Sequence, residues 1–173
     1  MNPQARTAIV TGASQGIGAG IVRRLLERGY NVVANSRGIA ASREVQASSH
    51  LALVEGSIGE PGVASETVQT AVRRFGSVDV LVNNAGIFFT KPFTDYTADD
   101  FRALVATNLE GFLYVTQGAV REMLARKTGG SIVTITAALV RNPIRGVTAS
   151  VPMITKGGLE AVTRHLAMEY RKD

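Results

Sequence analysis

The segment Thr11-Gly12-Ala13-Ser14-Gln15-Gly16-Ile17-Gly18 decides the fold class, because it joins a predicted strand to a predicted helix. Residues 6–10 form a short apolar run that suits a buried strand, and residues 16–28 carry apolar side chains at helical spacing. Gly12 permits a sharp turn, Gly16 lets backbone N–H groups approach an anion, and Gly18 allows the helix to pack closely. The helix N-terminus presents unpaired N–H groups, so the segment predicts a phosphate-binding loop rather than a glycine turn without a ligand.

The rest of the chain alternates between predicted strands and helices. Apolar runs predict further strands at residues 31–35, 51–54, 78–82 and 131–136. Helical spacing predicts helices at residues 40–47, 61–75, 98–126 and 152–171. This alternation predicts an α/β fold, a Rossmann-type doubly wound parallel sheet with helices on both faces. Because no internal repeat or linker interrupts the pattern, residues 1–173 are expected to form a single dinucleotide-binding domain.

The composition excludes several classes of function. The 173 residues are 45% hydrophobic and 19% charged, which is typical of a globular protein. There is no cysteine, which rules out disulfides and thiol catalysis, and His50 and His165 are too few for a histidine-rich metal site. No apolar run reaches about 18 residues, and none precedes the first loop, so we expect a cytoplasmic protein without a membrane span.

The net charge of +5 raises the question of an anionic partner. The lysines and arginines are scattered and form no dense cluster, so no nucleic-acid partner is expected. The positive charge then reflects solvated helix faces, or a few arginines that meet an anionic cofactor.

Two further motifs suggest a family. The spacing Gly-x-x-x-Gly-x-Gly, together with Asn83-Asn84-Ala85-Gly86 after the fourth strand, resembles the short-chain dehydrogenase/reductase family. Asn108 and Thr155-Lys156-Gly157-Gly158 extend the match over essentially the whole chain. The resemblance implies a Rossmann-type sheet, a nicotinamide cofactor and a small-molecule substrate. Members usually continue into a sixth strand, a substrate loop and a seventh strand. The given sequence is therefore incomplete, or the protein lacks part of its substrate-binding half.

The end of the second strand bears on the choice of nicotinamide cofactor. An acidic residue there would bind the ribose 2′-hydroxyl of NAD, whereas this chain has Ser36-Arg37. A guanidinium group pairs well with a phosphate, so NADP(H) is preferred and NAD(H) remains possible. The alternative is that Arg37 only faces solvent. The resemblance also places Ser57 where the family usually has an adenine-contacting Asp. The expected cofactor-binding residues are Gly12, Ser14, Gln15, Gly16, Ile17, Gly18, Ser36, Arg37, Ser57, Asn84, Ala85, Gly86 and Lys156.

The resemblance implies a catalytic set of asparagine, serine, tyrosine and lysine, which this chain matches only in part. Asn108 and Lys156 match the asparagine and the lysine, and they are the predicted catalytic residues. The tyrosine position falls on Pro152 and the serine position on Ala137. The neighbouring Thr136 should point to the opposite face of its strand, unless a bulge rotates its hydroxyl towards the site. Lys156 either donates the proton itself, if burial lowers its pKa, or only binds the ribose hydroxyls.

Two functions follow from these residues. The first is an NADP(H)-dependent oxidoreductase that transfers a hydride to or from a carbonyl or alcohol, with an atypical proton donor. The second is a catalytically inactive NAD(P)-binding homologue that acts as a cofactor sensor or an oligomeric scaffold. By resemblance, a homodimer or homotetramer is expected to form through the helices at 98–126 and 152–171. The apolar residues proposed for that interface are Val105, Leu109, Phe112 and Leu113, unless they all belong to the internal core.

Overall fold

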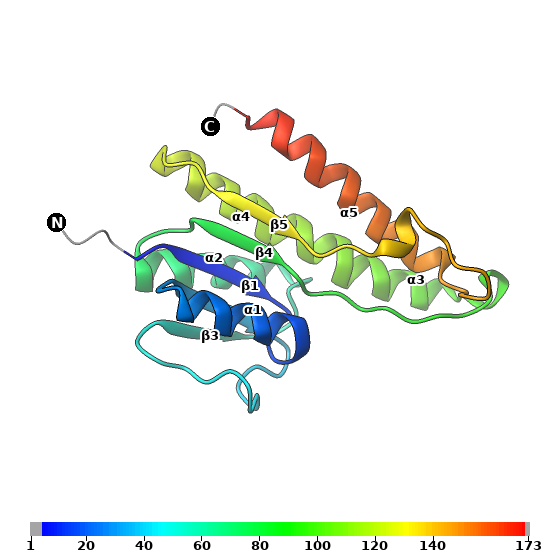
Figure 1. The fold of residues 1–173 in the computed structure, drawn as a ribbon, viewed down its shortest axis with the longest axis horizontal. Coiled ribbons are helices and arrows are strands. Elements are labelled where there is room, and N and C mark those ends of the chain that lie inside the picture. Colours follow the sequence, from blue (N-terminus) through cyan, green and yellow to red (C-terminus); the bar gives the residue numbers. More distant parts are fainter. Residues whose placement is uncertain (1–4, 172–173) are drawn as a thin grey trace.

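The computed structural model describes residues 5–171 as a five-stranded parallel sheet flanked by helices (Figure 1). The strands are β1 (Thr7–Thr11), β2 (Asn31–Ser36), β3 (Leu51–Glu55), β4 (Val80–Asn83) and β5 (Ser131–Thr134). Their order in the sheet is β3-β2-β1-β4-β5. The α-helices are α1 (Gly16–Glu27), α2 (Pro61–Phe75), α3 (Ala98–Leu104), α4 (Gly111–Arg126) and α5 (Ser150–Glu169). The predicted Rossmann-type α/β fold is confirmed.

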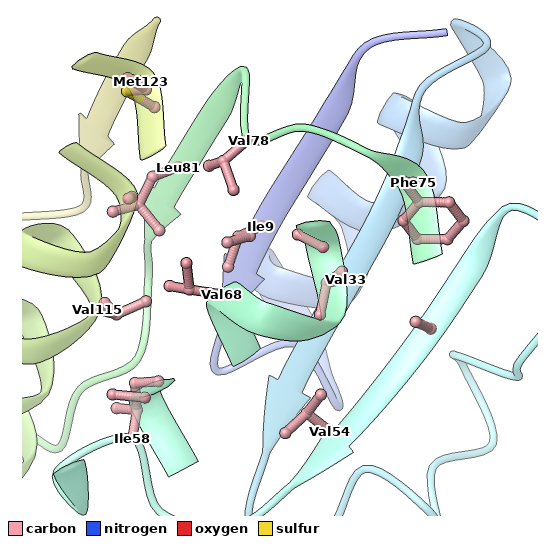
Figure 2. Packing of buried hydrophobic residues seen from close by; sticks show 14 residues of the cluster. Ile9, Val33, Val54, Ile58, Val68, Phe75, Val78, Leu81, Val115 and Met123 are labelled. Carbon is pink, nitrogen blue, oxygen red and sulfur yellow. The ribbon is translucent and has the colours of Figure 1, made fainter. Parts of the chain in front are cut away.

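Two apolar clusters cover the two faces of the sheet. Ile9 of β1 belongs to the cluster formed with α2 and α4, whereas Val10 belongs to the cluster formed with α1. The two residues belong to different clusters because neighbouring residues of a strand point to opposite faces. Both side chains are fully buried, since helices cover both faces. Figure 2 shows Ile9 and Leu81 of the sheet facing Val68 of α2 and Val115 of α4. In the described part of the chain no helix is long and apolar enough to cross a membrane.

The prediction of a short helix at residues 40–47 is wrong, because this segment consists of irregular turns. The Ser42 hydroxyl accepts hydrogen bonds from the Glu44 and Val45 amides, both at 3.2 Å. Serine that bonds to nearby amides competes with the helical hydrogen-bond pattern, and so short a helix is marginal in any case. Val45 of this segment, like the preceding Ile39, is instead buried in the cluster beside α1.

The long helix predicted at residues 98–126 is present, but it changes type along its length. Helix α3 passes into a π-helical turn, η2 (Val105–Glu110), and then into α4. Such π-turns widen a helix locally and are common at functional sites. The turn contains Asn108, which is only 1% exposed.

The ends of the last two elements also differ from the prediction. Strand β5 ends at Thr134, and a single-turn 3₁₀-helix, η3 (Ala138–Val140), follows it. Helix α5 begins at Ser150, so Pro152 lies in its first turn. Proline is tolerated there because the first-turn N–H groups have no partner within the helix. A similar 3₁₀ turn, η1 (Phe93–Asp95), precedes α3.

Candidate functional site

The three glycines of the loop between β1 and α1 meet different constraints. Gly12 and Gly16 adopt positive φ angles of 63° and 58°, which glycine tolerates best. A methyl group on Gly18 would overlap the Gly12 carbonyl oxygen and would lie 2.7 Å from Asn84 Nδ2. In contrast, a methyl group on Gly16 would meet no atom within 4 Å. The space beside Gly16 is therefore open to a ligand, while Gly18 is fixed by packing.

The loop is held in place by the segment that follows β4. Asn84 Nδ2 donates hydrogen bonds to the carbonyls of Thr11 and Gly12, both at 3.0 Å. The Thr11 hydroxyl oxygen accepts from the amides of Asn84 and Ala85 at 3.1 and 3.0 Å. The predicted binding residue Asn84 thus uses its side chain to brace the loop. Thr11 was not predicted, although its position between a strand and the first glycine was a usable signal.

The N-terminus of α1 is suited to an anion. Gln15 is the N-cap residue, and no side chain caps the first turn. The first turn of α1 also contains no acidic residue. Its free N–H groups and the positive end of the helix dipole can therefore bind a phosphate group, which fits the pyrophosphate of a dinucleotide.

Most of the predicted cofactor-binding residues line one pocket beside this helix end, which we call the glycine-loop pocket. Asn35 and Thr107 also line it, and neither was predicted. Asn35 is 1% exposed, and its Nδ2 donates to the carbonyls of Val54 and Gly56, which fixes the end of β3. Gly16, Ile17, Gly18, Asn84 and Lys156 lie outside the lining. The predicted residues that line the pocket are Gly12, Ser14, Gln15, Ser36, Arg37, Ser57, Ala85 and Gly86.

The two predicted catalytic residues lie close to Gly86, which lines this pocket. A methyl group on Gly86 would lie 3.1 Å from Lys156 Nζ and 3.2 Å from Asn108 Oδ1. A side chain at position 86 would therefore crowd both groups. The structure therefore brings together two groups that are 48 positions apart in the sequence, one from η2 and one from α5.

The side chain of Asn108 makes three hydrogen bonds. Its Oδ1 accepts from the Ile87 amide at 2.8 Å, and its Nδ2 donates to the Ile87 carbonyl at 3.1 Å. Nδ2 also donates to the Thr155 hydroxyl at 3.0 Å, and that hydroxyl donates to the Pro152 carbonyl at 2.9 Å. Thr155 is fully buried and was not predicted as a functional residue. Asn108 therefore links the segment after β4 to the first turns of α5.

Lys156 is a buried cation without a carboxylate partner among residues 5–171. It is 8% exposed, and its Nζ donates to the Ile135 carbonyl at 2.9 Å. Burial lowers the pKa of Lys156, because desolvation disfavours the charged form. An amine in this state releases a proton more readily than an exposed lysine.

The positions expected to hold the tyrosine and the serine supply no hydroxyl. Pro152 is buried in the first turn of α5, and Ala137 lies just before η3. Thr136 and Ala137 line a separate hollow together with Arg141 and Glu160. Within residues 5–171 no serine, threonine or tyrosine hydroxyl is hydrogen-bonded to Lys156.

Comparison with known proteins places this arrangement in a family. A family model for short chain dehydrogenases matches residues 6–173. The chain belongs to the short chain dehydrogenase family. It is 35% identical over 175 residues to 2,3-dihydroxy-2,3-dihydro-p-cumate dehydrogenase of Pseudomonas putida. The alignment covers 98% of this short chain dehydrogenase and 66% of the length of that relative.

Two solved structures of short chain dehydrogenases are also similar. Gluconate 5-dehydrogenase from Burkholderia cenocepacia, in complex with NADP and tartrate, has a TM-score of 0.83 at 27% identity, with 96% of this chain and 66% of that chain covered. The 3-ketoacyl-(acyl-carrier-protein) reductase from Brucella melitensis, complexed with NADH, has a TM-score of 0.89 at 26% identity. That match covers 96% of this chain and 70% of the reductase. One relative binds NADP and the other NADH, so the family is one of NAD(P)-dependent oxidoreductases.

Proposed function

We propose that this short chain dehydrogenase is an NADP(H)-dependent oxidoreductase that acts on a carbonyl or alcohol of a small molecule. When bound, the nicotinamide would supply or accept the hydride. One observation carries the proposal: Arg37 and Gly86 line the same glycine-loop pocket, and Lys156 and Asn108 lie beside Gly86. A dinucleotide with its pyrophosphate on the N-terminus of α1 would span these two regions.

The preference for NADP(H) rests on the groups at the end of β2. The hydroxyls of Ser14 and Ser36 are 3.0 Å apart, and Arg37 lines the same pocket. Arg37 is exposed and forms no ion pair with a carboxylate of the described residues. A ribose 2′-phosphate would therefore meet a guanidinium group and two hydroxyls.

We further propose that Lys156 handles the proton of the reaction. In the direction of reduction, its ammonium group donates a proton to the substrate oxygen as the carbon receives the hydride. In oxidation, the neutral amine takes that proton back. General acid catalysis is most efficient when the pKa of the acid is near the working pH, and burial moves the pKa of Lys156 in that direction. Asn108 positions this region by holding both polar groups of the Ile87 backbone.

A second function is favoured by one specific observation, the absence of a hydroxyl bonded to Lys156 in the described part of the chain. With Pro152 and Ala137 at the expected tyrosine and serine positions, the protein would bind the cofactor without turning it over. It would then act as a cofactor sensor or an oligomeric scaffold. The two functions share the glycine-loop pocket and differ only in turnover.

Steady-state assays distinguish the two functions. NADPH consumption is measured with a panel of aldehydes, ketones and quinones, for the native protein, for Lys156→Met and for Lys127→Met. Lys127 is an exposed lysine at the end of α4, so its variant is a control with the same change of charge and side chain. We expect turnover in the native protein and in Lys127→Met, and a loss of about 100-fold or more in Lys156→Met.

Two results would contradict the catalytic proposal. Full turnover in Lys156→Met would show that Lys156 does not transfer the proton. No turnover with any member of the panel, in a protein that still binds NADPH, would favour the sensor or scaffold.

We also propose that the protein is a homodimer or homotetramer that pairs through the helices at 98–126 and 152–171. Leu113, Leu124 and Val162 of these helices are 46%, 37% and 36% exposed. Phe112 is 7% exposed and belongs to the internal core, so it is not available to that interface. Light scattering tests the proposal, and a monomeric mass would contradict it.

A further inference from the structure

Two segments border the candidate site and meet again at some distance from it. The first is the irregular stretch that follows β4, and the second is the loop at 141–149, which leads into α5. Close to the site Asn108 connects the first segment to α5, because it binds the Ile87 backbone on one side and the Thr155 hydroxyl on the other. Figure 1 shows the two segments side by side again near α3, where a backbone hydrogen bond joins them.

The hydroxyl of Tyr96 lies at this outer meeting point. It donates a hydrogen bond of 2.9 Å to the Phe89 carbonyl and accepts one of 3.2 Å from the Lys91 amide. The Lys91 amide also donates to the Thr148 carbonyl at 3.1 Å, and Tyr96 Oη lies 3.4 Å from the same carbonyl. The ring of Tyr96 stacks on that of Phe89, with 5.9 Å between the centroids. One hydroxyl therefore contacts backbone groups of both segments.

The loop before α5 has few other restraints. Residues 141–148 are all exposed, so packing hardly holds them in place. Pro152 has no N–H, so the Thr148 carbonyl four residues earlier receives no helical hydrogen bond. In the described part of the chain, the hydrogen bonds that join residues 142–148 to a distant segment all end on that carbonyl. The proline at the expected tyrosine position thus leaves this carbonyl free to bind the segment after β4.

We propose that Tyr96 is a positioning residue, whose hydroxyl holds the loop at 141–149 against the segment after β4, and that this loop forms one wall of the substrate site. The inference rests on the proposed oxidoreductase function and deepens it. The loop borders the site because it leads directly into the first two turns of α5, which carry Pro152 and Lys156. Without the hydroxyl the loop would adopt further conformations, and the apparent affinity for the substrate would fall with the fraction of molecules that can bind it. Asn108 keeps its own hydrogen bonds, so the chemical step should not change.

Removal of a single hydroxyl tests this inference. Tyr96→Phe deletes the hydroxyl and keeps the stacked ring. Tyr30→Phe is the matched control, because Tyr30 is also partly buried and its hydroxyl has no hydrogen bond to the described residues. Both variants and the native protein are assayed with NADPH and the aldehyde, ketone or quinone that the native protein reduces fastest. Calorimetry gives the affinity for NADPH, and NMR hydrogen exchange without substrate gives the protection of the Lys91 amide.

We expect Tyr96→Phe to raise the KM for the substrate by about tenfold, as for a lost hydrogen bond, while kcat and the affinity for NADPH stay unchanged. The Lys91 amide should exchange faster in this variant, because it loses one acceptor and the loop that carries the other is released. The Asn84 amide, which is bound to the Thr11 hydroxyl, should keep its native exchange rate. Tyr30→Phe should match the native protein in all four measurements. A change in KM alone separates a positioning role from a general loss of stability.

The outcomes separate this inference from the proposed function. If the native protein reduces no member of the panel, the oxidoreductase function fails, and the role of Tyr96 fails with it. If the native protein turns over but Tyr96→Phe behaves like Tyr30→Phe, only the role of Tyr96 is overturned. A fall in kcat and in NADPH affinity together with the rise in KM would overturn it as well, and so would an unchanged exchange rate of the Lys91 amide.

Discussion

Single residues of the glycine loop differ in how much change they tolerate. Gly18→Ala would place a methyl group against the Gly12 carbonyl, so we expect the free energy of unfolding to fall by about 1–3 kcal/mol. Gly20→Ala, on the same helix, meets no atom within 4 Å, and alanine should raise that free energy by about 0.5–1 kcal/mol. Denaturant titrations measure both values. Similar effects at the two positions would show that Gly18 is not fixed by packing.

Lys156 links stability to pH. Its folded-state pKa is lowered by burial, so between that pKa and the unfolded value of about 10.4 the unfolded chain binds more protons. Stability should therefore rise as the pH rises through this window and be lower beneath it. Lys156→Met should lose this rise, whereas Lys127→Met should keep it. Parallel curves of unfolding free energy against pH for Lys156→Met and the native protein would contradict the buried, desolvated lysine.

Among the helices, α3 has the most complete N-terminal cap. The Thr97 hydroxyl accepts from the Asp100 amide, and the Asp100 carboxylate accepts from the Thr97 amide. Thr97→Ala should lower the free energy of unfolding by about 1 kcal/mol, while Thr94→Ala, whose hydroxyl bonds only to its neighbour, is the control. Equal losses in the two variants, measured by chemical denaturation, would argue against the cap.

The same cap has a predicted response to acid. The hydrogen bond from Lys91, with help from Thr97, lowers the pKa of Asp100 from 3.8 to about 2. A lowered carboxylate pKa contributes stability that is present above the ordinary value and is lost as the pH falls towards about 2. Asp100→Asn should flatten the acid dependence of stability in this range. An unchanged dependence would contradict the ion pair.

The helices, strands and loops differ in how well the sequence predicted them. Strands and helices were predictable where periodicity and glycine or proline signals agreed, as for α2 with Pro61 at its start. The irregular loop at 37–47 was not, because the bond from Ser42 to Ser14 joins residues 28 positions apart. In the same way, the π-turn at Asn108 depends on Ile87 and Thr155, which are distant in the sequence.

At the scale of the molecule, the sheet order explains why the candidate site forms. β1 and β4 are neighbours at the point where the strand order reverses. Strands β2 and β3 lie on one side of β1, and β4 and β5 lie on the other. Ligands of open α/β sheets bind at such a switch point, at the carboxyl ends of the strands. The glycine loop follows β1 and the Asn84-Ala85-Gly86 segment follows β4, so both meet there (Figure 1). The glycine spacing made this half of the site predictable.

Other predictions for the whole molecule stay predictions. These are the single domain over residues 1–173 and the oligomer through the helices at 98–126 and 152–171. The substrate was not predictable, because the residues expected to shape its pocket lie largely in the loop at 138–151, where no periodic pattern predicts how the side chains are placed. The chain also spans only 66% of the length of the Pseudomonas putida relative.

Titration calorimetry of the intact protein with NADPH and with NADH tests the central claim most directly, because both nucleotides need the glycine loop and only NADPH carries a 2′-phosphate. We predict saturable heat with both, tighter binding of NADPH, and a smaller difference between them in Arg37→Ala. The absence of heat with either nucleotide at about 1 mM would contradict a dinucleotide site in this pocket. Tighter binding of NADH would contradict the assignment of Arg37.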